Sequence, residues 1–234
     1  MSKYFLTKVN QLLFFAFFVT CLPVLASAEN TGMSENEYLP GNNSTVGIIL
    51  CHGRGKYPTW FVVEPLRTGI NSQLGYHTLS IQMPTDDISW RDYKKLFPEA
   101  HKQITKAIQY LKNKKGVNKV FLLGHSMGAR MVTSYLASHP DSGITGFIGV
   151  GIRNGGGIPL DSNRNLRLVR VPVLDVYGDG GDGKDKAHAI DRAGMVSPRY
   201  TQILVSGASH KFTRHEDELV SVVSKWLLTQ SSDE

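Results

Sequence analysis

Ten residues in the middle of the chain predict its fold: Lys119-Val120-Phe121-Leu122-Leu123-Gly124-His125-Ser126-Met127-Gly128. An apolar run of strand length ends directly in G-x-S-x-G, and residues from Met127 to about Ser138 have the pattern of a helix. The turn between them must be sharp, and glycine two residues before and after the serine leaves room for it. We therefore predict a strand, a tight turn and a helix, with the Ser126 hydroxyl raised above the sheet.

The same alternation of strand and helix extends to both sides of this motif. Further apolar runs of strand length are Val46–Cys51, Leu79–Met83, Gly143–Val150, Val171–Tyr177 and Tyr200–Val205. Helical patterns separate them at Val62–Gln73, Pro98–Lys112 and Lys184–Gly194, and a last one follows at Glu216–Leu228. Strands that alternate with helices of this length indicate an α/β fold with a mainly parallel sheet covered on both faces. In such sheets the chemistry lies at the carboxyl ends of the strands.

The first 28 residues have the pattern of an export signal. Lys3 and Lys8 precede an apolar run at 12–22, and Ala26-Ser27-Ala28 fits the small-x-small rule for cleavage after Ala28. The run is shorter than the roughly 20 residues that span a bilayer. We therefore predict a bacterial protein that is exported to the periplasm or secreted, without stable membrane insertion after cleavage.

After removal of the signal, the 234-residue chain consists of one predicted domain with a small positive net charge. Removing the signal takes away two lysines and no acidic residue, so the formal net charge falls from +6 to +4. No Lys/Arg run is interleaved with aromatic residues, which argues against a nucleic-acid partner. Residues 29–44 are polar and predict a flexible leader, and residues 45–230 form the predicted domain. Cys51 remains as a single thiol, which we interpret as a small buried hydrophobic residue.

A serine nucleophile needs a base and an acid that orients the base. His210 follows the last predicted strand, and from there its ring can reach Ser126 across the sheet edge. His215 is the nearest rival, but it falls at the entrance of the last helix. The acid should follow the preceding strand, where Gly178-Asp179-Gly180-Gly181-Asp182 lies. We favour Asp182, with Asp179 as the alternative.

With these features the chain resembles the α/β-hydrolase superfamily over most of residues 46–228. The resemblance is carried by His52-Gly53-Arg54-Gly55, Gly124 to Gly128, Pro172 to Gly178 with the acids behind it, and Gly207 to His210. It is similar in particular to a poorly characterised branch of exported bacterial proteins. The resemblance implies an oxyanion hole formed by the backbone amides of Met127 and Arg54. In the superfamily the acid often stands three residues after the glycine, and that position is Gly181 here.

Residues 178–188 also bear some likeness to two other kinds of site. Gly178, Gly180 and Gly183 fit G-x-G-x-x-G, and Gly178 with Gly183-Lys184 fits most of a P-loop, but Asp185 stands where Ser or Thr should follow. Carboxylates inside the loop would repel a phosphate, which argues against both. The spacing of Asp179, Asp182, Asp185 and His188 fits no established cation loop. We expect neither a metal nor an organic cofactor.

The predicted activity is that of a serine hydrolase acting on esters, thioesters or amides of a small acyl substrate through Ser126, Asp182 and His210. Two alternatives remain open: a non-catalytic binding protein of the same fold, and an acyltransferase that uses the same acyl-enzyme. Only about twenty residues separate the strands at 143–150 and 171–177, so no large cap domain is expected there. Arg54, Lys56 and Arg153 lie in loops at the expected site, and we predict that they favour anionic substrates, with Arg153 as a substrate-binding residue.

Overall fold

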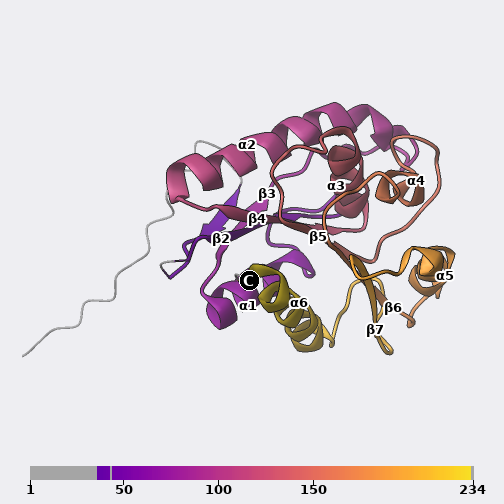
Figure 1. The fold of residues 1–234 in the computed structure, drawn as a ribbon. Helices are drawn as coiled ribbons and strands as arrows, with labels where there is room; N and C mark the ends of the chain where they lie inside the picture. Colours follow the sequence, from indigo (N-terminus) through magenta and orange to yellow (C-terminus); the bar gives the residue numbers. More distant parts are fainter. Residues whose placement is uncertain (1–35, 43, 233–234) are drawn as a thin grey trace, which may run out of the picture.

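A seven-stranded sheet runs through the centre of the molecule (Figure 1). The computed structural model describes residues 36–42 and 44–232. In sheet order the strands are β1 (Glu37–Leu39), β3 (His77–Ile81), β2 (Val46–Cys51), β4 (Lys119–His125), β5 (Gly146–Val150), β6 (Val173–Gly178) and β7 (Tyr200–Val205). β1 is antiparallel to β3, and every other neighbouring pair is parallel. The predicted mainly parallel sheet is confirmed.

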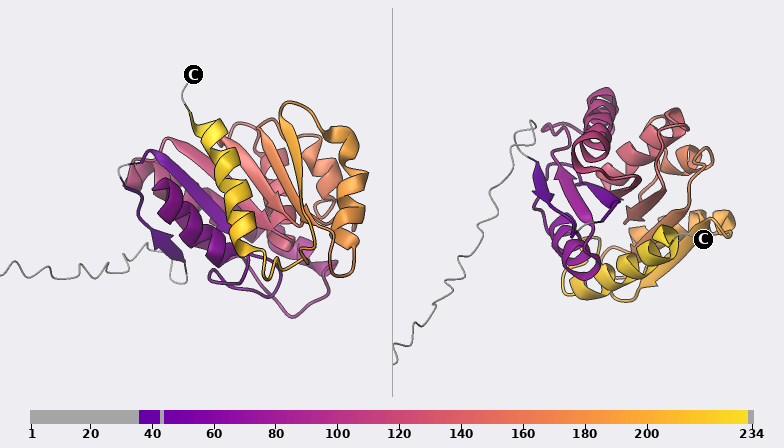
Figure 2. Two further views of the ribbon diagram at one scale, coloured as in Figure 1. Left: turned by 90° about the horizontal axis from the view of Figure 1, so that it is seen from below. Right: turned by 60° about the vertical axis from the view of Figure 1, so that its left-hand side comes forward.

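Helices cover both faces of this sheet (Figures 1 and 2). They are α1 (Val63–Leu74), α2 (Phe97–Lys115), α3 (Met127–Ser138), α4 (Ser162–Leu166), α5 (Lys184–Asp191) and α6 (Glu216–Ser231), with short 3-10 turns at Asp92–Leu96 and Ala193–Met195. α1 and α6 lie side by side on one face, and α2, α3 and α4 lie on the other. Because both faces are covered, the central strands are continuously apolar rather than alternating.

Two apolar clusters fill the spaces between the sheet and its helices. Leu66 and Ile70 of α1 meet Leu219 and Val223 of α6 in one cluster. Side chains of α2 and α3 form the other, which includes Ile104, Leu111 and Val132. Each cluster holds a whole layer of helices against the sheet, and the strand ends are thereby fixed relative to one another.

The structure differs from the prediction at the amino-terminal edge. Residues 29–44 were expected to be a flexible leader, but Glu37–Leu39 pairs with β3 as an edge strand. The Tyr38 hydroxyl donates a hydrogen bond of 2.7 Å to His77 Nδ1 and so ties the strand to the sheet. A three-residue strand is too short to show a period in the sequence. The predicted signal peptide, residues 1–28, lies outside the described residues.

The connection from β5 to β6 contains the five-residue helix α4 and no cap domain, as predicted. The carboxyl ends of β4, β5, β6 and β7 therefore stay open at one edge of the sheet. Within residues 36–42 and 44–232, the structure contains no helix that combines the length and apolarity needed to cross a membrane.

Candidate active site

Ser126 occupies the turn between β4 and α3 in a backbone conformation that is rare for a residue with a side chain. Its φ is 55° and its ψ is −114°. Conformations of this kind cost about 1–3 kcal/mol and persist only where the surrounding structure imposes them. Here β4 and the well-packed α3 fix the chain on both sides, so the strain raises the serine hydroxyl out of the sheet.

The two glycines of the motif make this turn possible because backbone passes close to both. A Cβ on Gly124 would lie 2.6 Å from the Ala129 Cα, and one on Gly128 would lie 2.2 Å from the Cys51 carbonyl oxygen. Backbone atoms cannot move aside as the end of a flexible side chain can. The glycines of G-x-S-x-G are therefore required by the contacts of α3 with β4 and β2.

His210 lies beside Ser126, as the sequence predicts. The loop after β7 brings its ring over the turn, and Ser126 Oγ lies 2.9 Å from His210 Nε2. The His210 carbonyl accepts a hydrogen bond of 2.9 Å from His125 Nε2, and the two rings pack with centroids 4.9 Å apart. The rival His215 lies at the start of α6, where its ring Nδ1 contacts the Thr213 carbonyl instead.

The carboxylate that contacts His210 is Asp185, which corrects the prediction of Asp182 or Asp179. The His210 Nδ1–H points to Asp185 Oδ2 at 2.7 Å, and Oδ1 lies 3.0 Å away. Asp182 instead binds Arg153 and Lys184, at 3.2 and 3.1 Å. Asp179 accepts a hydrogen bond of 2.8 Å from the Gly207 amide. Neither of the two predicted acids is hydrogen-bonded to His210.

The reason for the correction is the path of the loop between β6 and α5. Gly181 and Gly183 have positive φ, and with them the chain turns back before the helix begins at Lys184. The loop acids Asp179 and Asp182 have side chains that are 24% and 46% exposed, whereas the first turn of α5 places Asp185 where its side chain is 4% exposed. The sequence contains one indication of this role, because Asp185 falls in the first turn of the helix predicted at Lys184–Gly194. The prediction considered only the acids of the preceding loop and therefore did not include it.

Asp185 is held ionised by its partners. Burial raises its pKa, but the hydrogen bonds and positive charges of His210 and Arg153 outweigh burial and lower the pKa below its ordinary value. Arg153 Nε donates to Asp185 Oδ1 at 2.8 Å. One carboxylate therefore accepts hydrogen bonds from both the histidine and the arginine.

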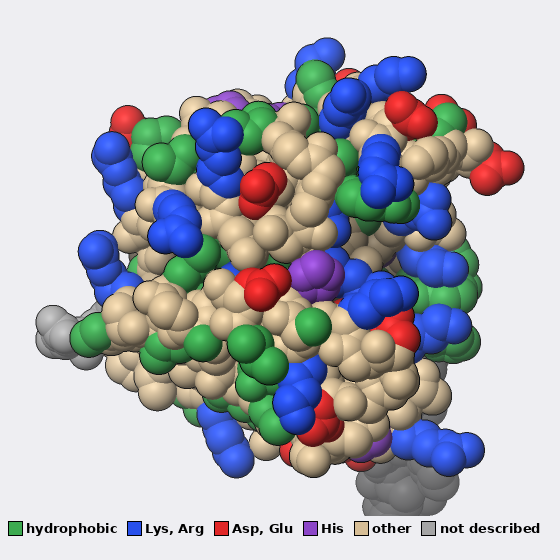
Figure 3. Space-filling view, turned by 90° about the vertical axis from the view of Figure 1, so that its right-hand side faces the viewer, with side chains coloured by type: hydrophobic (Ala, Val, Ile, Leu, Met, Phe, Trp, Pro, Cys, Tyr) green, Lys and Arg blue, Asp and Glu red, His purple; other side chains and the backbone are tan. Residues whose placement is uncertain are grey.

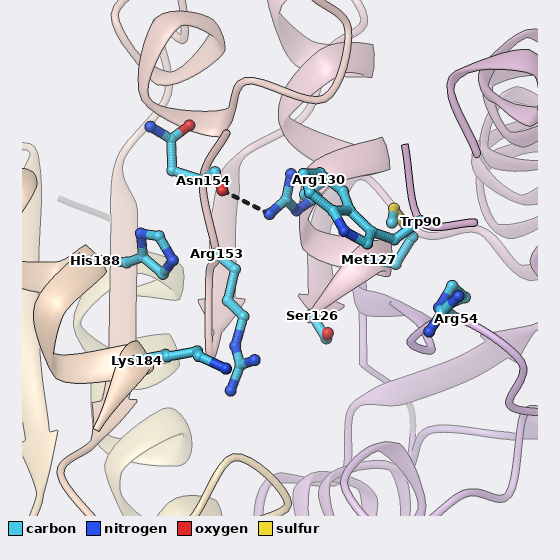
Figure 4. Close-up of a pocket in the computed structure, with 9 residues that line it drawn as sticks. All are labelled: Arg54, Trp90, Ser126, Met127, Arg130, Arg153, Asn154, Lys184 and His188. Carbon is cyan, nitrogen blue, oxygen red and sulfur yellow. Dashed lines mark hydrogen bonds between the residues drawn. The ribbon is translucent and has the colours of Figure 1, made fainter. Parts of the chain in front are cut away.

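The other expected site residues lie around one cavity of about 380 Å³ (Figure 4). Its walls are formed by Arg54, Trp90, Ser126, Met127, Arg130, Arg153, Asn154, Lys184 and His188. Met127 is the first residue of α3, where backbone N–H groups have no partner within the helix. Arg54 lies across the opening from α5. An oxyanion hole formed by their two amides stays a prediction.

The structure places three further residues that were singled out from the sequence. Arg153 lines the cavity, but its guanidinium binds Asp185 and Asp182. The Lys56 ammonium lies over the Trp60 ring at 3.9 Å rather than in the cavity wall. Cys51 is fully buried, and burial raises the pKa of its thiol, which agrees with the interpretation of a small core residue.

The glycines at the end of β6 and directly after it allow a close contact between two loops. A Cβ on Gly178 would lie 2.0 Å from the Ala208 carbonyl oxygen, and one on Gly180 would lie 2.3 Å from that of Gly207. The loop that carries His210 thus packs directly on the loop that leads to Asp185. This contact explains Gly178 and Gly180 without a phosphate, and the third glycine of the pattern, Gly183, has a φ of 67°. Among the residues that the structure describes, no three His, Cys, Asp or Glu side chains form a metal-binding group.

Comparison with known proteins identifies the family of this chain. Residues 89–229, more than half of the chain, match the family model described as "Protein of unknown function (DUF3530)". The chain belongs to this family. No curated protein matches the chain in sequence.

Solved structures of similar fold include proteins described as a serine hydrolase and a lipase. Est1E from Butyrivibrio proteoclasticus matches with a TM-score of 0.66 and 18% identity over 83% of this chain and 93% of its own. XC6422 from Xanthomonas campestris, described as an a/b serine hydrolase without lid, matches with a TM-score of 0.65 and 16% identity over 85% and 91%. A monoacylglycerol lipase from Paleococcus ferrophilus matches with a TM-score of 0.62 and 16% identity over 84% and 98%. This member of the family therefore has the α/β-hydrolase fold without a large cap, as predicted.

Proposed function

We propose that the protein is a serine esterase in which Ser126 is the nucleophile, His210 the general base and Asp185 the acid that orients the histidine. The observation that carries the proposal is the continuous line of contacts from Ser126 Oγ to His210 Nε2 and from His210 Nδ1 to Asp185, at 2.9 and 2.7 Å. Each distance is within hydrogen-bond reach, which is the geometric condition for proton transfer to a base. The serine hydrolase and the lipase named above support it through their shared fold.

The reaction follows from these contacts. His210 Nε2 accepts the proton of Ser126 as Oγ bonds to the ester carbonyl carbon, and Asp185 stabilises the imidazolium that results. The carbonyl oxygen becomes an oxyanion, which the amides of Met127 and Arg54 would stabilise. His210 then gives the proton to the leaving alkoxide, and an acyl-enzyme remains. Water attacks the acyl carbon by the same route in reverse, which releases the acid and restores Ser126.

The size of the site restricts the substrate. A cavity of about 380 Å³ is at the small end of the range for ligand pockets, about 300–1,000 Å³. No cap covers it in the connection between β5 and β6. We therefore expect compact acyl groups and an alcohol portion that extends into solvent.

A fluorophosphonate probe tests the proposal, because it labels only a serine that a base has activated. We expect labelling of the full protein, and loss of labelling in Ser126→Ala and in His210→Ala. His215→Ala is the matched control, since this histidine lies in the same loop region and does not contact Ser126. A folded protein that takes up no probe and cleaves no ester would refute the proposal and favour a non-catalytic binding protein.

Export is a separate proposal, supported by the charge and apolar pattern of residues 1–28. We expect the protein recovered from outside the bacterial cytoplasm to begin at Glu29. Mass spectrometry of the intact protein measures this directly. A recovered chain that still carries residues 1–28 would overturn the proposal of cleavage after Ala28.

A further inference from the structure

The cavity beside Ser126 is lined by positive charge. Its wall includes Arg54, Arg130, Arg153 and Lys184 and none of the acidic residues that the structure describes. Figure 4 shows Arg153 and Lys184 approaching each other on one side of Ser126, with Arg54 on the other side. Lys and Arg side chains are also widespread on the molecular face of Figure 3. A cavity of this sign attracts anions.

Arg130 has a structural role that its contacts explain. Its guanidinium donates to the carbonyls of Asn154, Gly155 and Leu160 at 2.8 to 3.0 Å, and it lies over the Trp90 ring. These bonds hold the connection after β5 in place. The Arg130 guanidinium therefore uses its hydrogen-bond donors within the protein, although its positive charge still acts on the cavity.

Arg153 and Lys184 are joined by the carboxylate of Asp182, whose Oδ1 also accepts a hydrogen bond of 3.2 Å from the Lys184 backbone amide. Asp182 Oδ1 accepts from Arg153 at 3.2 Å, and Oδ2 lies 3.1 Å from the Lys184 ammonium. The Asp182 side chain is 46% exposed, so water screens both contacts and each is weak. Arg153 Nε keeps its separate bond to the buried Asp185. An incoming anion can therefore take the contacts of Asp182 without disturbing that of Asp185.

We propose that the substrate is an ester carrying a second, anionic group, a carboxylate or a phosphate, which binds Arg153 and Lys184 in place of Asp182 while the ester carbonyl lies at Ser126. The proposal rests on the proposed esterase function. Arg54, which among the described residues has no carboxylate ion pair, adds positive charge on the opposite side. Neutral esters of the same size bind without this contact.

Matched pairs of esters test the charge preference. Monomethyl glutarate and monomethyl adipate carry the anion on the acyl side, and the dimethyl esters are their neutral partners. Butyryl glycerol phosphate carries it on the alcohol side, with monobutyrylglycerol as its partner. A charge-assisted hydrogen bond in a partly screened site contributes about tenfold. We expect kcat/KM to be about tenfold higher for the anionic ester in at least one of the two series, which also identifies the side on which the anion lies.

Two lysines on α5 provide a matched pair of variants. Lys184→Met removes a charge from the cavity wall, and Lys186→Met removes one from a lysine that pairs with Asp179 and does not line the cavity. We expect the anionic-to-neutral ratio of kcat/KM to fall about fivefold or more in Lys184→Met and to stay at its original value in Lys186→Met. An equal response of both variants, or a ratio near one in the unmodified protein, would overturn the proposal.

Binding to the Ser126→Ala protein separates this proposal from the esterase proposal. Calorimetry with monomethyl and dimethyl adipate, and with the two glycerol esters, measures affinity without turnover. Tighter binding of an anionic ester supports the charged subsite even if no ester is cleaved. Equal binding of both members in both series, together with fluorophosphonate labelling of the unmodified protein, overturns the subsite and leaves the esterase proposal intact.

Discussion

Replacing Asp185 by asparagine tests the assignment of the acid most directly. The side chain keeps its shape, but an amide cannot accept from His210 and Arg153 as a carboxylate does, and the negative charge that stabilises the imidazolium is lost. Loss of the acid in a serine–histidine–acid triad lowers kcat by about 10⁴-fold. Asp185 shares its charge between His210 and Arg153, at 2.7 and 2.8 Å, so part of its effect on the histidine is already neutralised. We therefore expect a loss of about 10³-fold, or about 4 kcal/mol in the activation barrier.

The assay is kcat for a neutral short-chain ester in three variants whose folding has been checked by thermal unfolding. Asp182→Asn and Asp179→Asn are the comparisons, because these were the two acids expected from the sequence and neither contacts His210. We expect each of them to lose less than tenfold. The reasoning is refuted if Asp182→Asn loses as much activity as Asp185→Asn, or if Asp185→Asn retains a tenth or more of the original kcat.

Three further predictions concern stability. Ser126→Gly should abolish activity yet raise the free energy of unfolding by about 1 kcal/mol, because glycine adopts a φ of 55° without strain; chemical denaturation measures both proteins. Arg192→Met should lower the free energy of unfolding by about 3–5 kcal/mol, because the substitution leaves the fully buried Asp175 carboxylate without its cation. A urea midpoint close to that of the unmodified protein would contradict this expectation. Burial lowers the pKa of His125 to about 3, so the unfolded chain binds a proton below pH 6.5 that the folded chain refuses. Stability is therefore lost as the pH falls, by about 2 kcal/mol between pH 6.5 and pH 5, and urea curves should show a smaller loss in His125→Gln.

Much of the fold could be predicted because its signals are local. The β4 run, its glycines and the start of α3 lie within ten residues, and the steric reason for each glycine is contact with the backbone of neighbouring elements. The parallel strands are long, apolar and separated by helices, so their period is visible. β1 and α4 were not predicted, because segments of three and five residues are too short to show the period of a strand or a helix.

The acid could not be assigned by the same means because its position depends on the path of a loop. Asp179, Asp182 and Asp185 are spaced three residues apart, and all three lie between β6 and the first turn of α5. Only the positive φ of Gly181 and Gly183, and the contact of Gly178 and Gly180 with the loop before His210, decide which of them turns inward. None of these features has a period in the sequence.

The position of Arg153 explains why the test of substrate charge must rest on Lys184. Arg153 was the residue expected from the sequence to bind substrate, yet its Nε holds Asp185 while its terminal nitrogen holds Asp182. Any Arg153 variant therefore changes the environment of His210 together with the charge of the cavity, and a loss of activity would have two explanations. Among the acids that the structure describes, Lys184 is paired with Asp182 alone, so its removal changes the cavity without reaching the histidine. If the anionic group of the substrate takes the place of Asp182, Arg153 loses its ion pair with Asp182 and must keep its ion pair with Asp185. The ion pair that is kept involves the buried carboxylate, and the ion pair that is lost involves the exposed one.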